Sequence, residues 1–139
     1  MFDFITVTKA LTDENRVRIL MALRDMEMCV CQITGFLDLS PSTTSKHLSI
    51  LRQARLIESR KKGKWVYYTV GNITTASETV RQVVAWMSKA LDDNPVVQED
   101  RQRIREILAR EESLCAKDPL MSDAYHSLAI HSLVDNTES

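Results

Sequence analysis

Two of the three cysteines in this 139-residue chain stand one residue apart, as Cys29 and Cys31, and the third is Cys115. Thiolates are soft ligands, suited to As(III), Sb(III), Cd(II), Pb(II) or Zn(II). Structural disulfides are not expected, because the count is odd and the N-terminus lacks the basic-then-apolar order of an export signal. The cysteines are interpreted as reduced thiols that bind a soft ion or react, with small buried hydrophobic side chains as the alternative.

The cysteine pair opens a short predicted helix, Val30–Leu37, in which Ile33 and Leu37 are four residues apart. A helix turns by about 100° per residue, so side chains two positions apart face nearly opposite ways. Both thiols can therefore hold one ion only if the first turn of this helix is absent or unwinds. Such a distortion would be passed on to the element that follows the helix.

The segment after this helix carries the start signals of another one. Ser40 is a good N-cap residue, and Pro41 suits the first helical position. Leu48 and Leu51 lie on the apolar side of this predicted helix. Two adjacent helices joined by a tight turn, the second polar at its N-terminus, form a helix-turn-helix, whose second helix can enter the major groove of DNA. The candidate DNA contacts on it are Ser42, Thr43, Ser45, Lys46 and His47.

A basic hairpin is predicted directly after this helix, over residues 58–70. Gly63 supplies its turn, and Trp65–Val70 is rich in aromatic and β-branched residues. A hairpin in this place is a wing. Its positive charge suits DNA phosphates and predicts a salt-dependent contribution to binding that is largely independent of sequence. The candidate phosphate contacts are Arg60, Lys61, Lys62 and Lys64.

Charge is distributed unevenly, although the formal net charge of the chain is only −1. Residues 40–70 hold seven lysines and arginines and one acidic residue, a net charge of +6. From residue 76 to the end there are seven basic and twelve acidic residues, a net charge of −5. A polyanion is therefore attracted to the middle of the chain and repelled by its end. The alternative is a protein-interaction module with a solvated basic loop, which binds through the acidic end.

The chain closely resembles the ArsR/SmtB family of metal-responsive winged-helix repressors over about residues 8–91. Within that family it is most similar to the arsenite-responsive ArsR branch, in which a Cys-x-Cys pair opens the helix before the recognition helix. The resemblance implies that the thiols of this pair bind the effector ion. It rests on the order of the predicted elements and on three strings, Cys29-Val30-Cys31-Gln32-Ile33, Ser45-Lys46-His47-Leu48-Ser49-Ile50-Leu51-Arg52 and Gly63-Lys64-Trp65-Val66-Tyr67-Tyr68.

The sequence departs from the family pattern at several positions. Many arsenite-responsive members have a third cysteine three residues after the second, where this chain has Thr34, so Cys115 is the remaining candidate for a third thiol. The segment Ala76–Leu91 contains no histidine, so the metal site that zinc-responsive relatives build there is missing. Arg55 stands where relatives usually have the glycine that ends the recognition helix in a left-handed turn, at a cost of about 1 kcal/mol.

The other predicted helices supply the core and a subunit contact. Helices are expected over residues 4–11 and Glu14–Arg24, the second capped from Thr12-Asp13. Along Ala76–Leu91 one apolar stripe runs the whole helix, too long for one small domain to cover, which predicts a homodimer held by this helix and the first one. The stripe consists of Val80, Val83, Val84, Met87 and Leu91.

The predicted fold class is mainly α with a small β-hairpin (α+β), a dimeric winged helix-turn-helix with a C-terminal helical extension. Residues 1–93 are assigned to DNA binding and dimerisation, and residues 94–139 to an acidic extension that is helical in part. No stretch is long and apolar enough to span a membrane, so a cytoplasmic location is expected. No glycine-rich phosphate loop, paired-carboxylate site or catalytic cysteine pattern appears, so an enzyme is not expected.

These observations together predict a transcriptional repressor of an arsenic-resistance operon. Its dimer is expected to bind an inverted repeat in double-stranded operator DNA, because two-fold protein symmetry matches a palindrome. As(III) or Sb(III) bound by the thiols is expected to release it, with other soft metal ions as possible effectors and no constitutive cofactor. The alternatives keep the fold but make the repressor responsive to Cd or Pb, or to oxidation or sulfur at the cysteine pair.

Overall fold

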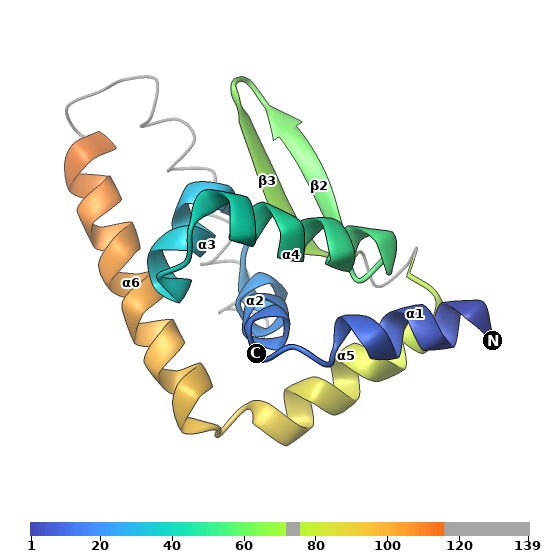
Figure 1. Cartoon of the computed structure of the whole chain (residues 1–139). Helices are drawn as coiled ribbons and strands as arrows, with labels where there is room; N and C mark the ends of the chain where they lie inside the picture. Colours follow the sequence, from blue (N-terminus) through green and yellow to red (C-terminus); the bar gives the residue numbers. More distant parts are fainter. Residues whose placement is uncertain (72–75, 116–139) are drawn as a thin grey trace.

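The computed structural model describes residues 1–71 and 76–115, without the side chains of Phe2 and of residues 112–115. Its helices are grouped around α2, and the hairpin of a small antiparallel sheet projects from one end of the molecule (Figure 1). The predicted mainly α winged helix-turn-helix is confirmed. The elements in chain order are α1 (Phe2–Ala10), α2 (Glu14–Asp25), β1 (Met28–Cys29), α3 (Val30–Leu37), α4 (Pro41–Gln53), β2 (Ile57–Lys62), β3 (Trp65–Val70), α5 (Glu78–Leu91) and α6 (Pro95–Cys115).

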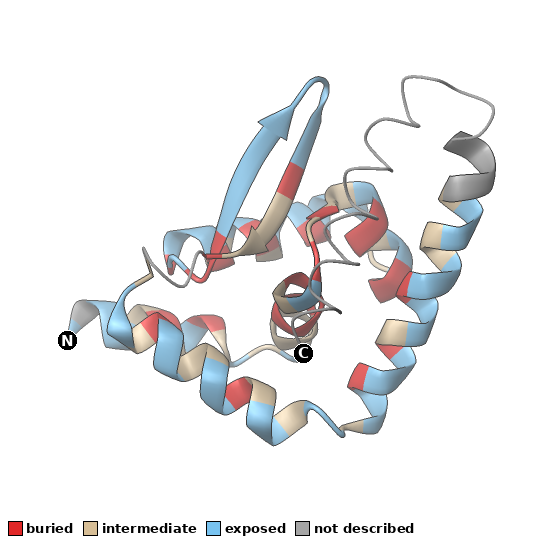
Figure 2. Cartoon of the chain, turned by 180° about the vertical axis from the view of Figure 1, so that it is seen from behind, coloured by how far each residue is buried: buried red, intermediate tan, exposed pale blue. Residues whose placement is uncertain are grey.

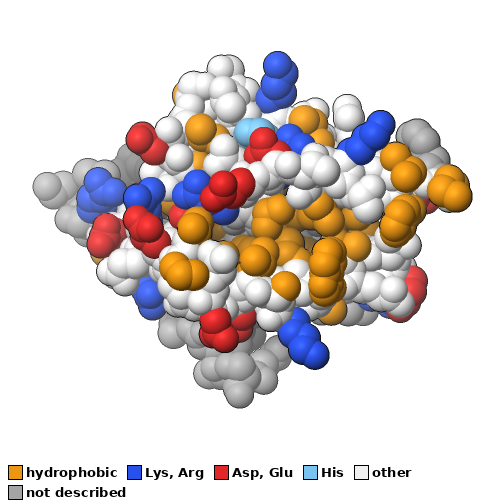
Figure 3. Space-filling view, turned by 60° about the horizontal axis from the view of Figure 1, so that its bottom comes forward, with side chains coloured by type: hydrophobic (Ala, Val, Ile, Leu, Met, Phe, Trp, Pro, Cys, Tyr) orange, Lys and Arg blue, Asp and Glu red, His pale blue; other side chains and the backbone are white. Residues whose placement is uncertain are grey.

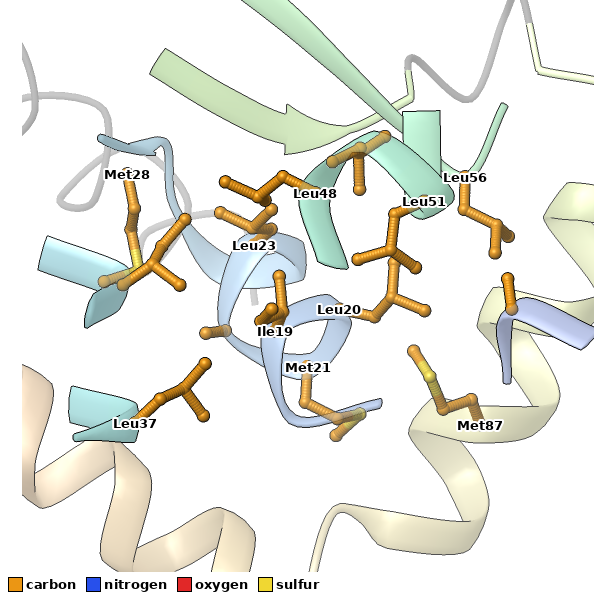
Figure 4. Close-up of a cluster of buried hydrophobic side chains, with 14 of the residues drawn as sticks. Ile19, Leu20, Met21, Leu23, Met28, Leu37, Leu48, Leu51, Leu56 and Met87 are labelled. Carbon is orange, nitrogen blue, oxygen red and sulfur yellow. The ribbon is translucent and has the colours of Figure 1, made fainter. Parts of the chain in front are cut away.

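The core is built around α2, which lies in the middle of the molecule. Asp13 caps this helix, as predicted, because its carboxylate accepts hydrogen bonds from the backbone N–H groups of Asn15 and Arg16. Figure 4 shows the apolar side chains of α2 meeting those of α3, α4 and α5. The largest of the side chains exposed by less than 2% are Phe36, Ile19, Leu20, Leu23, Met28, Ile33, Leu48, Leu51, Leu56 and Thr44.

The recognition helix α4 begins and ends as its sequence predicts. The Ser40 hydroxyl accepts from the Thr43 backbone N–H, and Pro41 occupies the first turn. After α4 the chain turns through Arg55, whose φ of 60° places a non-glycine residue in the left-handed region. The left-handed turn that favours glycine is thus formed here by an arginine, at the expected conformational cost.

The sheet contains one strand that the sequence pattern did not reveal. Its order is β1-β3-β2, and β3 pairs with β2 as the predicted hairpin, with Gly63 at a φ of 62° in the turn. The added strand β1 pairs with the other edge of β3, placing Met28 opposite Tyr68 and Cys29 opposite Tyr67. Two residues are too few for a strand periodicity to be recognised, so only the fold could show this pairing.

The apolar stripe of α5 is largely used within its own chain. Val80 and Met87 are buried in the core, while Val83, Val84 and Leu91 are half-buried against it. The expectation that the whole stripe faces a second subunit is therefore too broad. The helix begins at Glu78 and is capped by Ser77, two residues later than predicted.

Helix α6 forms the helical part of the predicted extension and packs along α3 and α2 (Figure 1). Val97 and Ile104 are buried in the same core as α2, so the extension shares the core of residues 1–93 up to this point. The side chain of Arg18 on α2 forms two hydrogen bonds to Asp100, at 2.8 and 2.7 Å. The rest of the predicted extension, residues 116–139, lies outside the described residues.

Within residues 1–71 and 76–115, no helix combines the length and the apolar composition needed to cross a membrane.

Candidate nucleic-acid interface and thiol site

The outer face of α4 is polar and points away from the core. Thr44, Leu48 and Leu51 are buried on the inner side of the helix. Residues at helical spacing on the opposite side are exposed, and these are Ser42, Lys46, Ser49 and Gln53. Short polar and amide side chains on one helix face are suited to base edges and phosphates in the major groove.

A shallow groove separates this face from the wing. It is lined by Ser45, Ser49, Arg52, Gln53 and Tyr68, so it runs between α4 and strand β3. Ser45 was among the predicted DNA contacts, whereas Ser49, Arg52 and Gln53 were missed. Continuing the i, i+3, i+4, i+7 and i+11 spacing from Ser42 along α4 would have found two of these three.

Two predicted contacts, Thr43 and His47, lie on the other flank of α4. Thr43 belongs to the helix cap, where its hydroxyl lies 2.8 Å from that of Ser40. His47 is half-buried, with its Nδ1 3.3 Å from a guanidinium nitrogen of Arg16. The same guanidinium donates to the backbone oxygens of Lys9 and Ala10 at the end of α1. Arg16 thus joins α1 to α4, and only Nε2 of His47 is left for a DNA contact.

The wing carries its basic side chains in exposed positions (Figure 2). Lys61, Lys62 and Lys64 are all exposed at the end of the hairpin. Arg60 lies nearer the base and forms a 2.7 Å ion pair with Glu27, the residue before β1. The three lysines are therefore the freer cations for phosphates, while Arg60 also fixes the wing to the segment that leads to the cysteine pair.

Cys29 lies at the junction of β1 and α3. It is the last residue of the strand and the N-cap of the helix, with an extended backbone (φ −88°, ψ 168°). Its backbone N–H donates to Oε1 of Gln32 at 3.0 Å, and its thiol faces the backbone N–H of Gln32, so the two residues form a capping box. The first thiol thus stands outside the helix, whereas Cys31 lies within its first turn.

The two thiols differ in exposure. Cys29 is half-buried, and Cys31 is exposed. Burial raises the pKa of the Cys29 thiol, and the nearby Cys31 and Glu111 raise it further, while the backbone N–H groups of Gln32 and Cys31 lower it by a smaller amount. Cys29 is therefore mainly protonated at neutral pH and must lose a proton to become a ligand.

A third soft ligand does not come from Thr34. Its hydroxyl donates to the backbone oxygen of Val30 at 2.7 Å and lies 3.3 Å from the hydroxyl of Thr44 on α4. Cys115 is the last residue of α6, and its side chain lies outside the described part of the chain, so its role as a ligand stays a prediction. Among the described residues, no three His, Cys, Asp or Glu side chains come together as a metal site.

The junction at Cys29 is connected to both predicted DNA-binding elements. Through β1 it is hydrogen-bonded to the wing strand β3, and through α3 it leads to the helix-turn-helix. Helices α3 and α4 pack together and share the contact between Thr34 and Thr44. A winged helix-turn-helix with a polar recognition helix and a basic wing defines the class of DNA-binding regulators.

Comparison with known proteins identifies the family. Residues 13–59 match the family model described as bacterial regulatory protein, arsR family. The chain is 36% identical over 90 residues to the arsenical resistance operon repressor of Escherichia coli (strain K12), a match covering 64% of this chain and 69% of that protein. The chain belongs to the ArsR family. These relatives are regulators rather than enzymes, in agreement with the expectation from the sequence.

A second relative carries a different metal in its name. The chain is 47% identical over 66 residues to the cadmium resistance transcriptional regulatory protein CadC of Lactococcus lactis subsp. lactis, a match covering 47% of this chain and 56% of that protein. The chain thus spans little more than half the length of this relative.

Solved structures agree with the fold. HlyU from Vibrio cholerae N16961 superposes with a TM-score of 0.56 at 30% identity, covering 66% of this chain and 94% of that one. The homodimeric winged helix-turn-helix domain of Mb0332 from Mycobacterium bovis superposes with a TM-score of 0.55 at 28% identity, covering 67% of this chain and 82% of that one.

The different surroundings of the two thiols predict unequal reactivity. In the reduced Cys115→Ser variant at pH 7, iodoacetamide should alkylate Cys31 about tenfold faster than Cys29, because Cys29 is less exposed and its pKa is raised. The Cys29 rate should then rise by about tenfold per pH unit until the pH exceeds its pKa. Peptide mass spectrometry measures both rates. Equal rates at pH 7 would contradict the described burial of Cys29.

Proposed function

We propose that this protein is a DNA-binding transcriptional repressor of an arsenic-resistance operon, released from operator DNA when As(III) or Sb(III) binds Cys29 and Cys31. The observation that carries this proposal is the position of Cys29, which belongs at once to the wing sheet and to the start of α3. An ion bound there acts on both elements that face DNA. The name of the Escherichia coli relative, an arsenical resistance operon repressor, supports arsenic as the effector.

Cadmium is the second candidate effector. It is favoured by the 47% identity to a cadmium resistance regulator and by the softness of Cd(II), which suits the same thiolates. Titrating the reduced protein with arsenite and separately with Cd(II), and following the thiolate-to-ion absorption band, distinguishes them. If neither ion produces a band while oxidation or a sulfur donor releases DNA, the cysteine pair is a redox or sulfur sensor.

DNA contact is proposed to use the outer face of α4 and the wing together. The face of Ser42, Lys46, Ser49 and Gln53 enters the major groove, where amide and hydroxyl groups reach base edges. Lys61, Lys62 and Lys64 then lie along the phosphates beside it. The wing sets the general affinity and the helix sets the sequence preference.

Release is proposed to follow from the geometry of the thiols. In the described state, Cys29 is extended and Cys31 is helical, so chelation by both requires the start of α3 to move. The movement pulls on β3 through the β1 pairing and on α4 through the packing of α3. Moving a dimer from almost fully bound to almost fully released takes about 5.5 kcal/mol of differential affinity between its two states.

A homodimer is proposed to form through α1 and α5, which both lie on the lower side of the molecule in Figure 1. Figure 3 shows hydrophobic side chains gathered on the lower side of the molecule, where these helices lie in Figure 1. Phe4 is 57% exposed and Trp86 is 69% exposed, large apolar side chains that a partner subunit would cover. Trp86 and Ala90 continue at helical spacing from Val83, along one edge of the apolar stripe of α5.

The switch predicts that Cys29→Ser and Cys31→Ser each leave operator affinity nearly unchanged but abolish release by arsenite. Hydroxyl oxygen is a poor ligand for a soft ion, and a single thiolate cannot chelate. Fluorescence anisotropy of a labelled operator duplex, titrated with arsenite, measures release. Cys115→Ser is the comparison variant and should show a smaller or graded effect. If the Cys29→Ser/Cys31→Ser double variant still leaves the operator on adding arsenite, the sensor lies elsewhere.

The different roles proposed for the wing and for α4 in DNA binding predict two classes of variant. Lys61→Ala and Lys62→Ala should each weaken binding to all duplexes alike and reduce the salt slope by about 1. Ser45→Ala and Gln53→Ala should instead change the preference at one base pair by about 1–3 kcal/mol. Anisotropy at several salt concentrations, with operator and scrambled duplexes, separates these effects, and Lys89→Ala on α5 is the charge control. A change of operator preference in the wing variants would reverse the assignment.

The proposed subunit contact predicts that Trp86→Glu yields monomers that lose operator binding, because a charge would be buried in the interface without a partner. Trp86 is mostly exposed within one chain, so the substitution leaves the core intact. Ala85→Glu, one residue earlier and turned by about 100°, is the matched control and should remain dimeric. Sedimentation velocity measures the oligomeric state, and an unchanged dimer for Trp86→Glu would exclude this interface.

A further inference from the structure

The side chain of Gln32 connects the cysteine pair to the C-terminal helix. It is only 3% exposed and makes two hydrogen bonds with its amide group. Its Oε1 accepts from the backbone N–H of Cys29 at 3.0 Å, and its Nε2 donates to Oε2 of Glu111 on α6 at 2.7 Å. The amide of Gln32 is thereby held at both ends, with Cys29 on one side and a carboxylate from 79 residues further along the chain on the other.

Other contacts hold α6 against α3 over the length of that helix. Ile107 lies so close to Gly35 that a Cβ added there would approach its Cδ1 to 3.1 Å. A guanidinium nitrogen of Arg103 lies 3.4 Å from the backbone oxygen of Phe36. Helix α6 is therefore fixed to the end of α3 by packing. Glu111, on the same helix α6, contacts the beginning of α3. If the beginning of α3 moves, α6 cannot easily move with it.

Binding of one ion by both thiols is expected to disturb this arrangement. The Cys29 backbone is extended and Cys31 is in the first helical turn, so we expect the start of α3 to rearrange when both sulfur atoms bind one ion. Such a rearrangement displaces the Cys29 N–H from Gln32. Because Gln32 is buried, its amide group is costly to leave unpaired.

We propose that Glu111 is a positioning residue for the sensor, which through its hydrogen bond to Gln32 holds Cys29 in the DNA-binding conformation and so opposes effector binding. The inference rests on the proposed function and deepens it by assigning a regulatory role to α6. Coupling between sites is reciprocal, so any contact that stabilises the ion-free conformation also weakens binding of the ion. Loss of the Glu111 contact should make the repressor more sensitive to its effector.

The charge of Glu111 and its hydrogen bond have opposite effects on a cationic effector. A negative charge near the thiols attracts Cd(II), whereas the hydrogen bond resists the movement that Cd(II) needs. Glu111→Gln removes the charge but keeps an oxygen that can accept from Gln32, and Glu111→Ala removes both. Glu106→Ala is the matched control, because Glu106 is an exposed carboxylate on the same helix whose hydrogen-bond partner is Gln102.

The first readout needs no effector. Amide hydrogen exchange of the Cys29 N–H, followed by nuclear magnetic resonance in the full-length reduced protein, reports how firmly Gln32 holds it. Glu111→Ala should speed this exchange by about fivefold, the factor expected for one lost hydrogen bond, while Glu111→Gln and Glu106→Ala leave it within about twofold of wild type. Unchanged exchange in Glu111→Ala would overturn the positioning role, whatever ion the protein senses.

The second readout is the Cd(II) or arsenite concentration that releases half of the operator DNA. Glu111→Ala should lower it by about fivefold, and Glu111→Gln should stay much closer to wild type. A higher concentration for Glu111→Ala, or equal shifts in both Glu111 variants, would show that charge acts in place of the hydrogen bond and would overturn the inference. Failure of the wild-type protein to respond to either ion would instead contradict the proposed function, because the exchange measurement stands independently of it.

Discussion

The backbone conformation of Cys29 is the constraint on which the DNA-binding half of the molecule depends. An extended residue can end a strand and cap a helix at the same time, and Cys29 does both. The wing sheet and the helix-turn-helix therefore share one residue instead of being joined by a flexible linker. Any change in that residue reaches two surfaces that are far apart in sequence but face the same side of the molecule (Figure 1).

Helix α2 is the central element of the core, and the helices that would move after a change at Cys29 pack around it. Its apolar side chains fill the core, while two of its arginines reach outward in different directions. Arg16 connects the end of α1 to His47 on α4. Arg18 forms an ion pair with Asp100 on α6, and Asp100 is only 4% exposed. The proposed dimer helix, the recognition helix and the C-terminal helix are thus all oriented from one central element.

The charged side chains at the two ends of the fold are arranged differently. The basic wing and α4 form the side suited to DNA, and the corner between α5 and α6 is an ion-pair cluster in which Asp92 accepts from Arg24 and Arg101. These two guanidinium groups, Arg101 first, lower the pKa of the exposed Asp92 carboxyl. Exposed pairs of this kind add little stability, but they neutralise charge at the bend between α5 and α6.

The sequence by itself determined the helices, the wing and the family, because helical periodicity, the Ser40-Pro41 start and the Cys-x-Cys string are local signals that survive without tertiary context. On the outer face of α4 it identified Ser42 and Lys46 but missed Ser49 and Gln53. Only the tertiary structure decided that Met28–Cys29 pairs with β3, that His47 is turned toward Arg16, and that Val80 and Met87 are covered within one chain. The hydrogen bond from Gln32 to Glu111 could not be predicted from the sequence either. The two residues are 79 positions apart, and a hydrogen bond leaves no periodic pattern in the sequence.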